Sequence, residues 1–169
     1  GMTGAFGLKA GELEGDILLN LDSETEGELY VGCAGGIDAT ITFDYTTEAF
    51  DSSYKAFALS IKGLKGGHSG MDIILQRGNA NKILFRILKA LEKVEVRVCE
   101  INGGSLRNAI PREAFCTIAL PAAKVEEAKQ ILADLTQIIK NELSAVEPEI
   151  LIALEETAKY MSKKKVLKY

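Results

Sequence analysis

The sequence predicts an α/β fold, a two-layer sandwich in which a mostly antiparallel sheet is covered by two helices. Apolar residues alternate with a period of two in several short runs, as in half-buried strands. In two longer runs they recur at spacings of three and four, as on one face of a helix. From residue 37 onward the order is strand, strand, helix, strand, strand, helix, strand. A ferredoxin-like topology with an extra leading strand satisfies this order economically.

Alternation places the strands along the chain. The leading strand is expected at 37–45, where apolar side chains share one face and aspartate or threonine side chains share the other. The run 54–63 repeats the pattern with Phe57, Leu59 and Ile61. Three further strands are expected, at 94–101, 114–120 and 149–155.

The two helices are expected at 79–91 and 122–143. Each carries an apolar stripe, with charged residues on the other faces of the second helix. Pro121 stands near the first turn of the second helix, where its missing N–H does no harm.

The two ends of the chain lie outside this predicted order of strands and helices. The segment 1–36 is rich in glycine and holds short apolar runs at 16–21 and 29–33, which resemble strands of another sheet. The segment 159–169 contains three consecutive lysines and is expected to be a basic tail, disordered or a non-native end.

Composition narrows the possible functions. The 169 residues suffice for a substantial core, and a net charge of −4 argues against a nucleic-acid-binding surface. No apolar stretch is long enough for a transmembrane helix, and no signal peptide is visible at the start. Cys33, Cys99 and Cys116 lie in separate strand-like runs, which favours small buried thiols in a reducing cytoplasm over a disulfide framework.

His68 is the only histidine of the chain and lies in the glycine-rich stretch 66–70. Glycines let backbone and imidazole approach a ligand closely, and histidine is the side chain that titrates near neutral pH. His68 is therefore a candidate for proton or ligand chemistry. The alternative is a turn histidine that only hydrogen-bonds to nearby backbone.

Two further segments are candidates. Asp22 ends the apolar run 16–21 and begins a series of alternating carboxylates, the oxygen ligands that hard cations prefer. On spacing alone, a solvated acidic loop is the favoured alternative. In 102–113, Asn108 offers a donor and an acceptor, and Arg107 with Arg112 can clamp a carboxylate. The alternative there is an ordinary strand connection with solvated arginines.

Three segments taken together resemble one family. They are 19–36, which contains LNLDSE, 62–70, which reads KGLKGGHSG, and 102–114, which reads NGGSLRNAIPREA. In order and spacing they resemble the aminoacyl-histidine dipeptidases (Xaa-His dipeptidase, peptidase D), a branch of the dinuclear zinc peptidases that includes carnosinase. The resemblance extends from Gly1 to about Ala158.

The resemblance implies a cytoplasmic two-domain metallopeptidase whose zinc-bearing catalytic domain is interrupted by a lid domain. Residues 1–36 would end the first catalytic segment, and 37–158 would form the front part of the lid. Asp22 matches a ligand of one of two zinc ions, His68 a lid histidine that reaches the substrate carbonyl, and Asn108 a lid asparagine that helps to hold the substrate. Its partners would be a dipeptide, the rest of the catalytic domain and a second copy in a homodimer, without nucleic acid or membrane.

The family's other zinc ligands and its general-base glutamate have no counterpart here. The chain is therefore expected to be an internal fragment that is inactive alone. One alternative function is a non-catalytic α/β module for dimerisation or interaction. Another is a regulatory domain of the same topology that binds a free amino acid.

Overall fold

The computed structural model describes residues 3–17, 19, 25–32, 35, 37–49, 52–158 and 165–167. The chain divides into two compact units, Gly1–Thr42 and Phe43–Tyr169. In the first unit, the helix α1 (Thr3–Gly7) is the regular element among the described residues. The second unit contains the expected sandwich.

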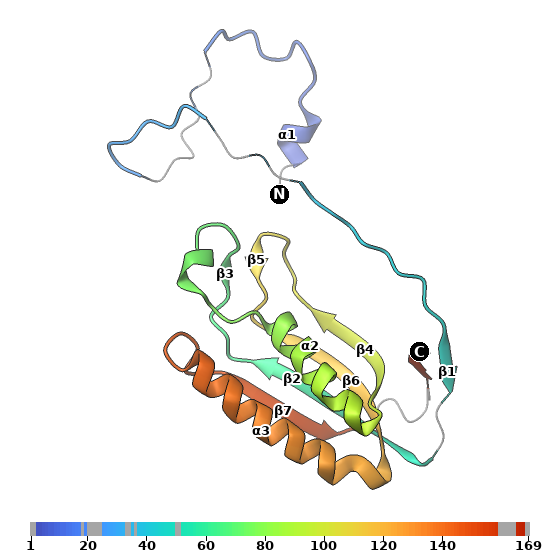
Figure 1. Ribbon diagram of the computed structural model, residues 1–169. Coiled ribbons are helices and arrows are strands. Elements are labelled where there is room, and N and C mark those ends of the chain that lie inside the picture. Colours follow the sequence, from blue (N-terminus) through green and yellow to red (C-terminus); the bar gives the residue numbers. More distant parts are fainter. Residues whose placement is uncertain are drawn as a thin grey trace. The chain divides into compact units, whose positions relative to one another are not determined.

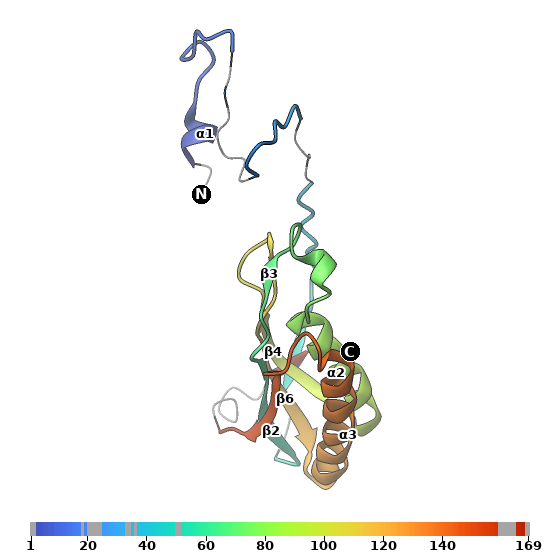
Figure 2. The same ribbon diagram turned by 90° about the vertical axis from the view of Figure 1, so that its left-hand side faces the viewer.

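The sheet of this sandwich has four antiparallel strands, in the order β4-β6-β2-β7. Their bounds are β2 Tyr54–Lys62, β4 Arg97–Gly103, β6 Ala114–Pro121 and β7 Leu151–Glu156. Helices α2 (Ala80–Leu91) and α3 (Val125–Leu143) lie on the same side of the sheet, as Figures 1 and 2 show. This arrangement confirms the predicted two-layer, ferredoxin-like fold.

The core lies between the sheet and the helices. Leu59 and Ile61 of β2 and Leu84 and Ile87 of α2 are at most 1% exposed. Burying each such side chain stabilises the fold by about 1.5–3 kcal/mol. Helix α2 begins after Asn79, whose side chain accepts a hydrogen bond of 3.1 Å from the Lys82 N–H, as an N-cap residue does.

Strand β4 and helix α3 both begin later than expected. The chain leaves α2 through a 3-10 turn, η2 (Glu92–Val94), and Glu95 then adopts a left-handed conformation with φ 58°. Strand β4 consequently starts at Arg97 instead of residue 94. A second 3-10 turn, η3 (Ala122–Lys124), precedes α3, so that this helix begins at Val125.

The leading strand expected at 37–45 is absent, and this prediction was wrong. These residues have irregular backbone, and Ile37 is 98% exposed. The described positions of the runs expected at 16–21 and 29–33 are likewise in turn or irregular conformation. An apolar run forms a strand only where another strand pairs with its backbone, and the described residues supply no partner for these segments.

The second unit also contains a two-stranded ribbon, formed by β1 and β8. Strand β1 (Thr47–Ala49) pairs antiparallel with β8 (Lys165–Leu167), so the described part of the expected tail is a strand. Val166 is buried and packs against Ala119 of β6. Arg97 of β4 ties the ribbon to the sheet through an ion pair with Glu48 and a hydrogen bond of 2.9 Å to the Leu167 carbonyl.

Candidate functional site

Two of the candidate residues lie on one small ribbon. Strand β3 (Gly67–His68) pairs antiparallel with β5 (Ala109–Ile110), and His68 stands opposite Ala109 (Figure 1). One step further, the Ser69 N–H donates a hydrogen bond of 2.9 Å to the Asn108 carbonyl. The fold thus brings His68 and Asn108 side by side, with both residues exposed to solvent.

The His68 imidazole has a defined orientation. Its Nδ1 accepts hydrogen bonds from the backbone N–H groups of Gly70, at 3.1 Å, and Met71, at 3.2 Å. In the neutral ring the proton then resides on Nε2, which becomes a hydrogen-bond donor. His68 does contact nearby backbone, as the turn alternative proposed, but these contacts use Nδ1 and leave the ring exposed.

Asp72 and Arg77 stabilise the turn that carries this histidine. The Asp72 carboxylate accepts a hydrogen bond of 2.7 Å from the His68 N–H and lies 3.5 Å from the Arg77 guanidinium. Arg77 also donates a hydrogen bond of 2.6 Å to the Gly66 carbonyl. Neither residue is predicted from the sequence, because their partners are mainly backbone groups and no side-chain pattern signals them.

Glu147 connects the two ends of the loop 65–78, which contains His68. It is 1% exposed and accepts hydrogen bonds from the backbone N–H groups of Lys65, at 2.8 Å, and Gly78, at 2.9 Å. The chain leaves the sandwich near Lys65 and returns near Gly78, so one buried carboxylate fixes both points. This residue is not predicted from the sequence either, since nothing local to it indicates such a distant contact.

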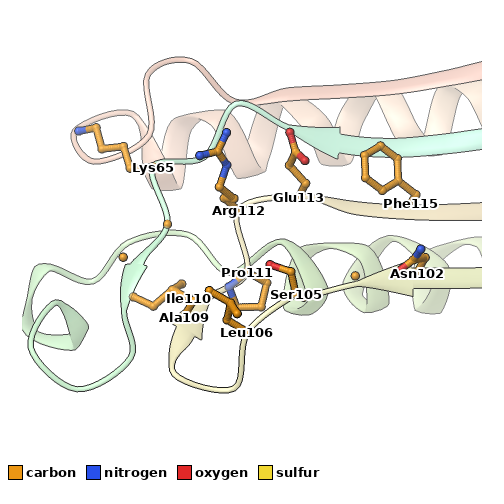
Figure 3. A pocket seen from close by; sticks show the side chains of 14 residues that line it. Lys65, Asn102, Ser105, Leu106, Ala109, Ile110, Pro111, Arg112, Glu113 and Phe115 are labelled. Atoms are coloured by element: carbon orange, nitrogen blue, oxygen red, sulfur yellow. The ribbon is translucent and has the colours of Figure 1, made fainter. Parts of the chain in front are cut away.

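Two grooves flank the ribbon. One, of about 600 Å³, lies between the entry to β3 and the segment from Asn102 to Phe115, with Lys65, Arg112 and Glu113 among its lining residues (Figure 3). The other, of about 370 Å³, adjoins α2 and α3. Arg112 is among the residues that line the first groove, and the two-arginine clamp stays a prediction.

Other candidates are less well defined by the structure. Asp22 and Cys33 lie outside the described residues. Within the described ranges, no group of three or more histidine, cysteine, aspartate or glutamate side chains is arranged to hold a metal ion. In the same part of the chain, no helix is both long and apolar enough to cross a membrane.

These features define a class of protein: a ferredoxin-like α/β sandwich that carries an exposed histidine on a loop held by hydrogen bonds. Residues 59–147 match the M20 peptidase dimerisation domain, and the chain belongs to this family. The family assignment agrees with the lid domain that the resemblance implied.

Comparison with individual proteins confirms the resemblance to the aminoacyl-histidine dipeptidases. The chain is 50% identical over 159 residues to the cytosol non-specific dipeptidase of Escherichia coli (strain K12), a match that covers 94% of this chain and 33% of the relative. It is 51% identical to the aminoacylhistidine dipeptidase of Vibrio alginolyticus, whose crystal structure superposes with a TM-score of 0.81 over 99% of this chain and 34% of that one. The chain therefore spans about a third of the length of both relatives.

Proposed function

We propose that this chain is the lid-bearing part of a cytoplasmic zinc dipeptidase that hydrolyses Xaa-His dipeptides. The observation that carries the proposal is the pairing of β3 with β5, which sets His68 beside Asn108. These are the two lid residues that the resemblance links to substrate binding. The 50% identity to a cytosol dipeptidase supports the assignment.

In this proposal His68 is the catalytic residue of the lid. Its Nε2–H donates a hydrogen bond to the oxyanion that forms when water attacks the scissile carbonyl. Such a donor typically accelerates the chemical step by about 10²–10³-fold, since it stabilises charge that develops in the transition state. Asn108 holds the peptide through its amide, which both donates and accepts.

The metal site is proposed to lie mainly outside this chain. The described residues form no such site, and Asp22 would contribute one ligand, whereas a catalytic zinc has three protein ligands. The two zinc ions of the complete enzyme would supply an activated water and polarise the carbonyl. The chain alone is expected to be inactive.

The same proposal includes a homodimer. The family to which residues 59–147 belong is a dimerisation domain. Because His68 is exposed, it can act in the active site of its own subunit or in that of a partner subunit.

The test measures hydrolysis of an Xaa-His dipeptide by the complete, zinc-loaded protein and its variants. His68→Ala is expected to lower kcat by about 100-fold or more. Asn108→Ala is expected to raise KM, because it weakens substrate binding. The matched control is Asn141→Ala, an exposed asparagine on α3. Full activity of the His68→Ala enzyme would show that His68 has no catalytic role.

A further inference from the structure

We propose that Asp72 and Arg77 are positioning residues, which fix the His68 imidazole and act on the reaction through it. The inference rests on the proposed function of His68. It adds two residues that contact neither the imidazole ring nor, in this proposal, the substrate.

Asp72 holds the backbone of His68 from both sides. Its carboxylate accepts the His68 N–H at 2.7 Å, and its own N–H donates to the His68 carbonyl at 3.0 Å. The turn closed by these two bonds contains Gly70 and Met71, whose N–H groups orient the ring through Nδ1. Without the carboxylate the His68 N–H loses its partner, and the turn that orients the ring loosens.

Arg77 stabilises Gly66, the residue that precedes strand β3. Its guanidinium donates to the Gly66 carbonyl at 2.6 Å and lies 3.5 Å from the Asp72 carboxylate. The backbone of Gly67 packs closely against the side chains of Asp72 and Arg77. A Cβ at Gly67 would lie 2.5 Å from both Arg77 Nη1 and Asp72 Oδ2, and its φ of 141° also disfavours a side chain.

The polar contacts matter here because the loop is poor in apolar ones. Met71 is 74% exposed and Ile74 is 79% exposed, so the hydrophobic core does not hold this segment. A segment with few buried apolar contacts opens easily. The orientation of His68 therefore depends on the hydrogen bonds of Asp72 and Arg77.

The first arm of the test uses this chain, in which a single histidine gives a single set of imidazole NMR signals. Relaxation of the His68 ring and backbone is compared between the parent chain, Asp72→Ala and Arg77→Met. We expect lower order parameters for the ring in both variants. The matched controls Asp134→Ala and Arg86→Met remove exposed polar contacts on the helices and should leave His68 unchanged. Unaltered ring order in folded Asp72→Ala and Arg77→Met chains would overturn the proposal.

The second arm is a double-mutant cycle in the complete enzyme. Asp72→Ala is expected to lower kcat by about 10–100-fold with little change in KM, since the donor is misplaced. In a His68→Ala background it should have almost no further effect. An equal fall in both backgrounds would mean general structural damage and would overturn the proposal. If His68→Ala alone left activity intact, the proposed function would fail, while the NMR arm would still decide whether Asp72 and Arg77 hold the ring.

Discussion

The two described thiols are poor candidates for nucleophiles. Burial raises the pKa of Cys116 to about 12, with smaller contributions from Cys99 and Glu100, and burial together with Glu100 raises the pKa of Cys99 to about 11. At neutral pH both groups are therefore neutral thiols, whereas the thiolate is the reactive form. Cys116 is buried as the sequence predicted, whereas Cys99 is only partly buried.

We therefore predict slow alkylation of both thiols at pH 7–8. Cys99 should react before Cys116, because Cys99 is only partly buried and Cys116 is fully buried. Mass spectrometry of peptides after timed alkylation gives both rates, and urea-unfolded chain serves as the reference. A native Cys116 that reacts as fast as in the unfolded chain would contradict the prediction.

Glu147 allows a second prediction. Glu147→Ala leaves the N–H groups of Lys65 and Gly78 without their acceptor, and the loss should lower the free energy of unfolding by about 1–3 kcal/mol. Urea denaturation measures the change. Glu149→Ala, which removes a neighbouring exposed carboxylate, is the matched control and should have little effect. Equal stability of the two variants would argue against this role.

The sequence identified some of these residues and not others for a physical reason. His68 and Asn108 stand in glycine-rich segments whose composition is unusual in itself. Asp72, Arg77 and Glu147 act mainly on backbone groups, which every residue possesses. Their partners become visible only when the chain is folded.

Helices α2 and α3 are joined across their exposed surfaces by an ion pair. Arg86 donates hydrogen bonds of 2.5 and 2.8 Å to the two carboxylate oxygens of Glu142. The hydrogen bonds from Arg86, and secondarily its charge, lower the pKa of Glu142. The folded chain therefore holds the Glu142 proton more weakly than the unfolded chain does, and folding stability gains from this pair above the ordinary glutamate pKa.

This pair predicts a specific pH dependence. Arg86→Met should reduce the free energy of unfolding modestly at neutral pH, because the pair is exposed and screened. The deficit should vanish as the pH falls below 4.5, the ordinary pKa of glutamate, and through the lowered pKa of Glu142. Urea titrations across this pH range measure it. A deficit that is the same at all pH values would mean that the arginine acts through packing instead of charge.

The elements that the sequence predicted well are those in which apolar residues recur regularly over many residues. Helix α2 and strand β2 present their apolar residues at regular spacing, and their positions are confirmed. The segment 37–45 has an equally clear alternation but is irregular, because pairing with a second strand is a non-local property. Strands β3 and β5 have two residues each, too few to show any period.

For the whole molecule, the family assignment predicts self-association. The chain belongs to a dimerisation domain family. Its sandwich unit exposes one large apolar side chain on each of α2, α3 and the edge strand β7, namely Phe85, Ile138 and Leu151. Light scattering coupled to size exclusion is expected to give twice the mass of one chain.

The same measurement on variants separates association from catalysis. His68 and Asn108 lie at the β3–β5 ribbon, outside the four-stranded sheet and its two helices. If the sandwich forms the interface, His68→Ala and Asn108→Ala should remain dimeric while the complete enzyme carrying them loses activity. A monomeric parent chain would contradict the prediction of a dimer. Dissociation caused by His68→Ala alone would place the ribbon in the interface, so that the loss of activity could no longer be assigned to the imidazole alone.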